Sequence, residues 1–247
     1  MPHFKLTLEY DGSDFCGCQA QGQGERTVQG ELEKVLAKIF KQDISSIASG
    51  RTDSGVHATG QVVSFKAKIR MTPAQIQKAL NSVLPRDIVV LEVKSVGTDF
   101  HAQYSARRKT YRYTVLNRDH GSAFWRDRAY FYPHQLDLAA MRRAAKYLVG
   151  EHDFKSFQAH DPLRAERDTV RTVKALTVIG DGDFIHIQVT ANGFLYKMVR
   201  NMVGTLLAVG CGRMKPAQVK ALLKAKNRQA APETAPAHGL YLTSVNY

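Results

Sequence analysis

The sequence predicts an α+β protein built from two similar α/β halves, each with a mainly antiparallel sheet, that flank a central cleft. Three patterns predict this class. Apolar residues alternate with polar ones from Phe4 to Tyr10, as in a half-buried strand, and an apolar stripe at helical spacing runs through residues 28–40. Two alternating runs between residues 173 and 190 are separated by Gly180-Asp181-Gly182, which is typical of a β-hairpin.

The first half continues with a strand, a helix and a second strand. Residues 60–68 alternate as a strand. Thr72, Pro73 and Gln75 then supply an N-cap, a proline at the first helical position and the partner of a capping box, for a helix that ends near Leu84. Residues 88–93 form the next apolar strand.

The second half repeats this rhythm more loosely, and no low-complexity linker separates it from the first. We therefore predict two domains, residues 1–104 and residues 105–247. The elements expected after residue 104, besides the hairpin, are a strand at 111–116, helices at 138–149, about 194–209 and after Pro216, and a strand at 240–245. Residues 227–237 are rich in Ala and Pro, which predicts a surface loop.

Composition favours a soluble cytoplasmic protein without disulfides. The chain has 247 residues and 44% hydrophobic content, no apolar run approaches the roughly 18 residues of a membrane span, and the amino terminus alternates like a strand instead of a signal peptide. Three cysteines, Cys16, Cys18 and Cys211, are too few for a disulfide framework. No second Cys or His pair stands at zinc spacing, so we expect reduced thiols.

The charge distribution predicts that the second half binds a polyanion. Residues 1–104 carry 12 Lys and Arg against 11 Asp and Glu, whereas residues 105–247 carry 23 against 11. Residues 184–232 include eight basic residues and no acidic one. Residues 100–118 interleave Lys and Arg with tyrosines, a mixture suited to phosphates and stacked bases. The simpler alternative is a basic solvated surface.

The most informative segment is the loop Gly50-Arg51-Thr52-Asp53-Ser54-Gly55-Val56-His57-Ala58. Gly50 and Gly55 let the backbone take positive φ and let another segment approach closely. Arg51 and Thr52 can orient Asp53 through charge and hydrogen bonding, which suits a nucleophile. Alternatively, Asp53 caps a turn and Arg51 is its ion-pair partner.

This loop resembles the catalytic loop of the tRNA pseudouridine synthase A (TruA) family, in which the Asp is essential. Other blocks resemble that family in the same order: Tyr10-Asp11-Gly12-Ser13, Thr27-Val28-Gln29-Gly30-Glu31, Lys109-Thr110-Tyr111-Arg112-Tyr113, His152-Asp153-Phe154, Asn192-Gly193-Phe194 through Gly204, and Ala237-His238-Gly239-Leu240-Tyr241. The resemblance covers nearly the whole chain and implies the pseudouridine synthase fold. Cys18 departs from the pattern, because the family usually has Trp there; the nearby loop is therefore expected to be looser.

The resemblance also implies an activity and its partners. The expected reaction converts uridine to pseudouridine at positions 38 to 40 of the tRNA anticodon stem-loop, and the expected assembly is a homodimer. Because the reaction is an isomerisation, it needs no cofactor and no metal. Whether Asp53 attacks C1′ or C6, or assists a glycal route, stays open. The target base must also leave its stack.

Four further residues are assigned to substrate binding. On the helix at 194–209, Arg200 flanks the apolar face, where it could pair with Asp53 and keep it ionised. The resemblance makes Arg200 an active-site residue, Tyr111 the aromatic that stacks on uracil or takes a sugar proton, and Leu240 an apolar wall. It also implies that Arg51 holds the flipped nucleotide, and it gives His57 only a structural role.

Two other functions remain as alternatives. One is an RNA-binding protein of the same fold without catalysis, which the presence of Asp53, Tyr111 and Arg200 disfavours. The other is a metal-dependent nuclease that uses Asp53 with His57. A nuclease needs a second cluster of acidic ligands, and none stands at ligand spacing.

Overall fold

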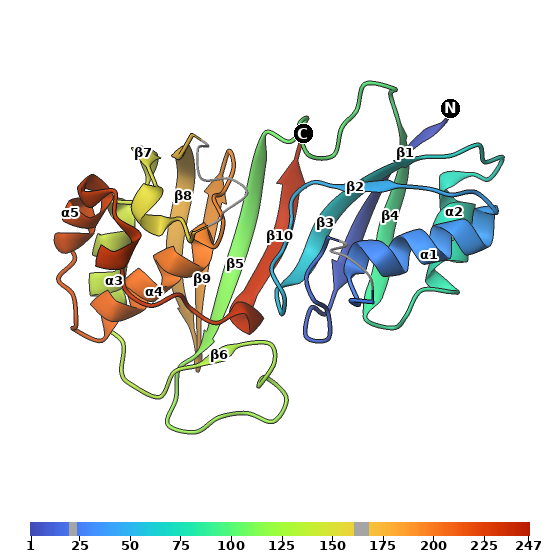
Figure 1. The fold of residues 1–247 in the computed structure, drawn as a ribbon. Helices are drawn as coiled ribbons and strands as arrows, with labels where there is room; N and C mark the ends of the chain where they lie inside the picture. Colours follow the sequence, from blue (N-terminus) through green and yellow to red (C-terminus); the bar gives the residue numbers. More distant parts are fainter. Residues whose placement is uncertain (20–23, 161–167) are drawn as a thin grey trace. The chain divides into compact units, whose positions relative to one another are not determined.

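A computed structural model describes residues 1–19, 24–160 and 168–247, and it confirms the α+β class (Figure 1). The chain divides into two compact units. The first contains Met1–Arg107 together with Tyr241–Tyr247, and the second contains Arg108–Leu240. Each unit holds a mainly antiparallel set of strands and its own helices.

The compact units differ from the expected domains at the last strand. Strand β10 (Leu240–Asn246) pairs in parallel with β3 (His57–Lys66), so that Tyr241 lies opposite His57. The main-chain N–H of Arg107 also donates to the carbonyl of Asn246 at 2.8 Å. The final seven residues therefore complete the first unit, although they follow the whole second unit in sequence.

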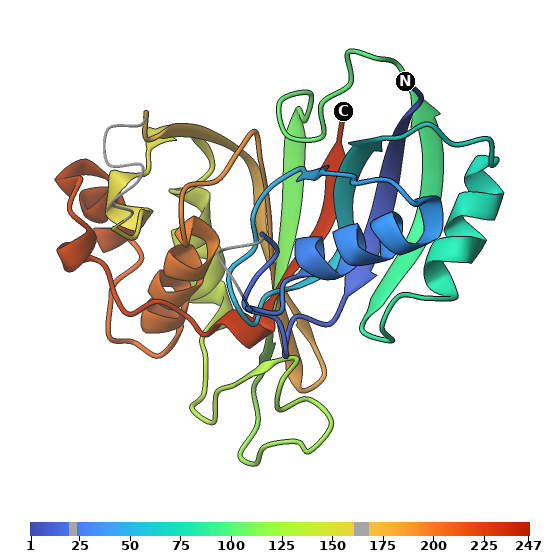
Figure 2. The same ribbon diagram turned by 45° about the vertical axis from the view of Figure 1, so that its right-hand side comes forward.

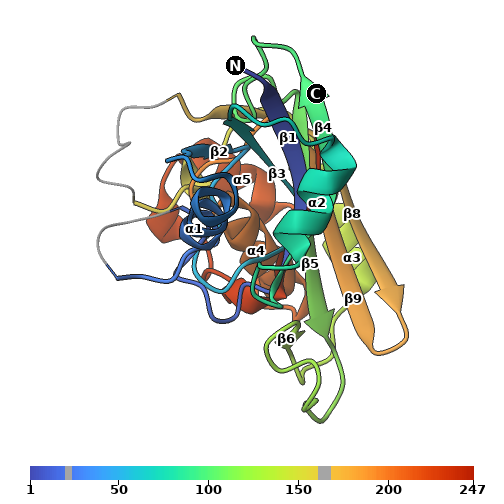
Figure 3. The same cartoon turned by 90° about the vertical axis from the view of Figure 1, so that its right-hand side faces the viewer.

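The first unit buries its core between one sheet face and two helices. Its strand order is β4 (Ile88–Val96), β1 (His3–Tyr10), β3 and β10, with the short β2 (Ser46–Ala48) paired to β3. Helices α1 (Val28–Phe40) and α2 (Pro73–Asn81) lie on the same face of this sheet (Figure 3). The core side chains come from both layers: Phe4, Leu6, Leu8, Leu32, Leu36, Phe65, Ile76, Leu80 and Val90.

The predicted start of α2 is confirmed in detail. The Thr72 hydroxyl accepts from the N–H of Gln75, and the Gln75 side chain accepts from the N–H of Thr72, which completes the capping box with Pro73 at the first helical position. The helix ends at Asn81, three residues before the expected end.

The Thr72→Ala substitution is expected to destabilise the protein by about 1 kcal/mol, because it removes the acceptor for one orphan N–H of the helix. Urea denaturation measures the change. Thr98, an exposed threonine outside the helices, provides the matched control in Thr98→Ala. Equal stability of the two variants would contradict a stabilising role for the cap.

The second unit has strands in the order β5 (Arg108–Leu116), β9 (Phe184–Ala191), β8 (Val170–Asp181) and β7 (Gly150–Asp153). A short strand, β6 (Tyr130–Phe131), pairs in parallel with β5. The predicted hairpin is β8–β9, but its turn lies two residues later than expected. Asp181 pairs with Phe184, which leaves Gly182 and Asp183 as the turn, with Gly182 at φ 55°.

The helices of the second unit are α3 (Leu138–Lys146), α4 (Met198–Gly210) and α5 (Gln218–Ala225). Helix α4 begins four residues after the expected start, because Lys197 adopts a left-handed conformation at φ 56°. Every α4 residue except Arg200 is buried. The expected apolar face is thus confirmed, but the helix is covered on its other sides as well.

Residues 227–237 form a surface loop, as expected, and this loop also covers α4. This segment contains a 3-10 turn, Arg228–Ala230, and it packs on the helix. Buried Asn201 of α4 accepts hydrogen bonds from the Thr234 hydroxyl at 2.6 Å and from Arg228 Nη2 at 3.1 Å. A Cβ at Gly204 would collide with the main-chain oxygen of Glu233. We call residues 227–240 the strap.

Within the residues that the structure describes, no helix is both long enough and apolar enough to cross a bilayer. The longest irregular segment of the second unit joins β5 to β6 and projects away from both strands (Figure 2). It carries Phe124, which is 85% exposed.

Candidate active site

Asp53 lies at the first position of a turn that the main chain closes. The N–H of Val56 donates to the carbonyl of Asp53 at 3.2 Å, and Gly55 takes φ 76°, which is favourable for glycine. Gly50, expected to share that freedom, does not take a positive φ. Because main-chain groups close the turn, the half-buried Asp53 carboxylate is not needed to form it.

The residues on both sides of Asp53 are tied to the segment that follows β1. Thr52 forms a buried hydroxyl–hydroxyl hydrogen bond with Tyr10 at 2.8 Å, and its carbonyl accepts from the N–H of Cys18 at 3.1 Å. The Ser54 hydroxyl donates to the carbonyl of Phe15 at 3.1 Å. These contacts fix the backbone on either side of the carboxylate, which is what a preorganised catalytic group requires.

Two glycines allow this close approach. A Cβ at Gly17 would lie 2.9 Å from the carbonyl oxygen of Thr52, and Gly17 takes φ 100°. A Cβ at Gly12 would collide with the carbonyl oxygen of Val56. Gly12 belongs to a block that resembles the family, but sequence reasoning gave neither glycine a role.

Cys18, at the position where the family usually has Trp, is bonded through its main chain and its side chain, and the expected looser loop stays a prediction. Its carbonyl accepts from the N–H of Gln29 at 2.9 Å, and its thiol lies 3.6 Å from Gln61 Nε2. Burial raises the pKa of the Cys18 thiol to about 11, so the thiol is protonated at neutral pH. Gln61 also donates to the carbonyl of Gly50 at 2.9 Å, which holds the residue before the exposed Arg51.

His57 links the loop of Asp53 to the turn after β1. The N–H of Gly12 donates to its Nδ1 at 2.9 Å, and Asp11 Oδ1 lies 3.2 Å from the same nitrogen. The ring is 2% exposed and stacks on Tyr241, with 4.7 Å between ring centroids. These contacts give His57 a structural place in the loop.

The second unit carries the other three predicted site residues. Tyr111 is on β5 opposite Val189, is 8% exposed and meets the ring of Phe194 edge to face at a centroid distance of 5.0 Å. Leu240 is the first residue of β10 and is buried. Both side chains are therefore set in packed surroundings.

Arg200 is half-buried and bonded to the strap. Its Nε donates to the carbonyl of Ala235 at 2.8 Å, and its own carbonyl accepts from the N–H of Ala235 at 3.1 Å. The Arg200 side chain is thus held through Nε. The helical pattern in the sequence had predicted only that Arg200 lies beside the apolar face of the helix.

Tyr113 is a positioning residue that sequence reasoning missed. Its hydroxyl donates to the carbonyl of Pro236 at 2.9 Å, and a Cβ at Gly239 would lie 2.6 Å from its ring. Burial raises the pKa of Tyr113 well above its usual value, with the positive charge of Arg200 acting in the opposite direction. Tyr113 and Arg200 therefore hold the strap just before Leu240.

The predicted site residues thus fall into two groups, one in each unit. Arg51 and Asp53 share one loop of the first unit, while Arg200 and Leu240 are connected through the strap of the second. The expected ion pair between Asp53 and Arg200 stays a prediction. Among the described residues, no group of three or more His, Cys, Asp or Glu side chains is arranged to hold a metal ion.

Comparisons with known proteins show which family the chain resembles. The family model described as tRNA pseudouridine synthase matches residues 7–105 and 144–247. The tRNA pseudouridine synthase A of Bacillus pumilus is 48% identical over 245 residues, covering 98% of both chains. The enzymes of the same name from Moorella thermoacetica and Caldicellulosiruptor bescii are 47% and 42% identical and cover 100% of both chains. A solved Cbf5-Nop10-Gar1 complex is similar at 13% identity with a TM-score of 0.37, covering 96% of this chain and 57% of that chain.

The match to this family model places the chain in the pseudouridine synthase class of RNA-modifying enzymes. The matched regions span most of the chain, and the relatives align over their full lengths. The chain belongs to the tRNA pseudouridine synthase family, and it is an isomerase that acts on tRNA.

Proposed function

We propose that this isomerase converts uridine to pseudouridine at positions 38 to 40 of the tRNA anticodon stem-loop, with Asp53 as its catalytic residue. The observation that carries the proposal is the fixation of the loop on both sides of Asp53, by Thr52 and by Ser54. A carboxylate held in this way can attack the sugar or the base without first being ordered, and that ordering would otherwise add to the barrier.

The reaction breaks two bonds and forms two, with no net gain or loss of atoms. The N1–C1′ bond of uridine breaks, the base rotates and a C5–C1′ bond forms; C5 then gives up its proton to a base or to solvent, and N1 gains a proton. The starting and final nucleosides are isomers, so no oxidant, reductant or group donor is consumed. We therefore propose that the enzyme works without a cofactor or a metal ion.

Four residues are proposed to bind the substrate. Tyr111, with its ring held by Phe194, offers a face for stacking on uracil. Arg200, whose Nε donates to the carbonyl of Ala235, is proposed to present its planar guanidinium group to the substrate. Leu240 supplies an apolar wall, and the exposed Arg51 holds the flipped nucleotide beside Asp53.

The charge of the second unit supports its proposed role in binding the tRNA. Residues 108–240 carry 22 Lys and Arg against 11 Asp and Glu, whereas the residues of the first unit carry 13 against 11. Phosphates provide much of the affinity of RNA-binding proteins, so this unit supplies the attraction that offsets the cost of flipping the base.

We also propose that the protein is a cytoplasmic homodimer, in which the first unit carries the catalytic Asp53 and the second unit binds tRNA and completes the active site. Free cysteines at positions 16, 18 and 211 suit a reducing compartment. The 85% exposed Phe124 and the 41% exposed Trp125 provide apolar surface for a second copy. Sedimentation analysis would test the assembly.

Activity is expected to persist in excess chelator. The proposed chemistry depends on a carboxylate and hydrogen-bonding side chains, so removal of divalent ions should leave the rate unchanged once the tRNA is folded in monovalent salt. Pseudouridine is measured in unmodified tRNA incubated with the enzyme and EDTA. Loss of activity that a divalent ion restores on prefolded tRNA, or strand cleavage in place of isomerisation, would favour the metal-dependent nuclease.

A further inference from the structure

A pocket of about 320 Å³ lies within the second unit, formed by the end of α3, strand β7 and helix α5. Three lysines, Lys146, Lys220 and Lys224, are among its lining residues. Lys220 and Lys224 are four residues apart on α5 and therefore project from the same face of the helix. Lys146 is the last residue of α3 and joins them from the other side of the pocket.

The three ammonium groups are not neutralised by the acidic residues of the neighbouring strand. Asp153 of β7 pairs with Lys226 at 3.0 Å and accepts from the Thr169 hydroxyl at 2.6 Å. Burial raises the pKa of Asp153, but hydrogen bonds from Thr169 and Lys226 leave it below its usual value. Among the described residues, no carboxylate lies within 4.0 Å of the three pocket lysines.

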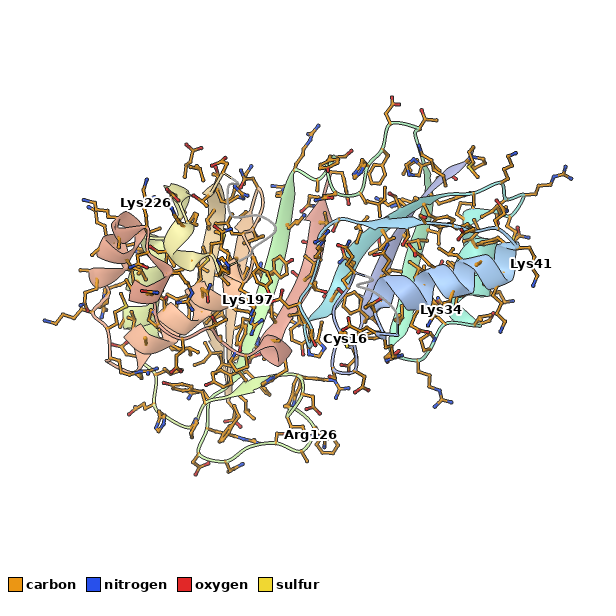
Figure 4. The ribbon with its side chains drawn as sticks, in the orientation of Figure 1. Cys16, Lys34, Lys41, Arg126, Lys197 and Lys226 are labelled. Atoms are coloured by element: carbon orange, nitrogen blue, oxygen red, sulfur yellow. The ribbon has the colours of Figure 1, made fainter. Side chains whose placement is uncertain are left out.

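Lys226 therefore does not contribute to the pocket, although it follows the same helix (Figure 4). Lys146 and Lys224 occupy the last turns of their helices, where a cation is favourable. That effect explains their positions along the helices, but it does not explain why three lysines converge on one hollow with no carboxylate partner.

The rest of the lining is apolar and aromatic. Val149 and Leu223 provide aliphatic surface, and Tyr147 provides a ring that is 38% exposed. His152 is held in place because its Nε2 bonds to the carbonyl of Val149 at 3.0 Å. Cations beside an exposed ring and an apolar wall match a nucleotide, which presents a phosphate next to a flat base.

We propose that this pocket binds a nucleoside phosphate, namely one nucleotide of the bound tRNA that lies outside the uridine being modified. The proposal rests on the proposed function for the identity of the RNA. The volume lies at the lower end of the range of about 300–1,000 Å³ for small-ligand sites, which suits a single nucleotide. Lys146, Lys220 and Lys224 bind its phosphates, and Tyr147 contacts its base.

The test compares two triple variants that remove the same charge. The pocket variant is Lys146→Gln, Lys220→Gln and Lys224→Gln. The control is Lys155→Gln, Lys174→Gln and Lys215→Gln, three exposed lysines of the same unit that do not line the pocket. Binding of unmodified tRNA is measured across a salt titration, with thermal unfolding as a check on folding.

The pocket variant is expected to raise the Kd for tRNA at least tenfold and to reduce the salt slope by about one to two units, because it loses one or two phosphate contacts. The control should change Kd less than threefold. A Tyr147→Ala variant should weaken binding without altering the salt slope, since stacking releases no counterions. Equal weakening by both triple variants would overturn the proposal, because the lysines would then act only through the overall charge.

Binding of free uridine monophosphate distinguishes two possible ligands of the pocket, a nucleotide of the tRNA and a free small phosphorylated molecule. If it binds the wild type but not the pocket variant, while both bind tRNA equally, the pocket serves a small phosphorylated molecule and the RNA assignment is wrong. Pseudouridine formation by the wild type is measured in parallel. If the wild type forms no pseudouridine but the pocket variant still loses affinity for tRNA, only the proposed function is refuted. If the wild type is active and the pocket variant binds tRNA normally, only the proposed role of the pocket is refuted.

Discussion

The Asp53→Asn variant is expected to form no detectable pseudouridine while its affinity for tRNA stays within a few fold of the wild type. The substitution keeps the size of the side chain and removes its nucleophilic charge. The loop should keep its shape, because Thr52, Ser54 and the main chain hold it on either side of the carboxylate. Single-turnover kinetics and a binding assay on the same tRNA measure the two effects separately.

Asp14→Asn provides the matched control, since Asp14 is an exposed carboxylate in the neighbouring turn of the same unit. This variant should keep the wild-type rate. Conversion by Asp53→Asn above that of a heat-denatured sample would refute the assignment of Asp53. Equal losses in the two variants would point to a general effect of charge.

Arg200→Lys is expected to lower the single-turnover rate by about 10- to 150-fold. Lysine keeps the positive charge but loses the planar fork, and a charge-assisted hydrogen bond contributes about 1.5–3 kcal/mol. The substitution also removes the bond from Nε to the carbonyl of Ala235, so some loss of stability accompanies it. The rate must therefore be measured together with the thermal midpoint.

The Arg228→Lys variant separates the loss of rate from the loss of stability. Arg228 holds the same strap through Asn201, Thr234 and Ala231, but it is not assigned to the substrate. This control should lower the thermal midpoint and leave the rate at saturating tRNA close to that of the wild type. If both variants lose rate in parallel, Arg200 acts only by holding the strap.

Local signals in the sequence predicted most of the helices and strands. The capping box at Thr72 was found because its residues are three positions apart, and α1 was found because its apolar stripe is continuous. The pairing of β10 with β3 was not predictable in the same way, since it joins segments more than 170 residues apart in the sequence. Nothing in the local pattern of residues 240–245 shows which strand they will join.

The strap illustrates a second limit. Residues 227–237 are polar and rich in Ala and Pro, so their composition indicates a loop, but it cannot show that the loop covers α4. The signal lay in the helix itself, where Asn201, Gly204 and Thr205 stand among apolar residues. Small and polar residues on a helix face accommodate a close backbone segment and its hydrogen bonds, as Asn201 does for Thr234.

For the active site, sequence reasoning identified the loop of Asp53 but not the contacts that fix it. The bonds from Tyr10 to Thr52 and from Cys18 to Thr52 join segments more than 30 residues apart. The roles proposed for Asp53, Arg51, Tyr111, Arg200 and Leu240 remain predictions, because they are decided by measurements of activity and substrate binding.

Mapping of pseudouridine at single-nucleotide resolution, in unmodified tRNA treated with the wild-type enzyme, tests the central claim most directly. We expect new pseudouridine at positions 38 to 40 and nowhere else, and no product at a position where uridine has been replaced by cytidine. Intact tRNA without pseudouridine at these positions, or pseudouridine only at other positions, would contradict it.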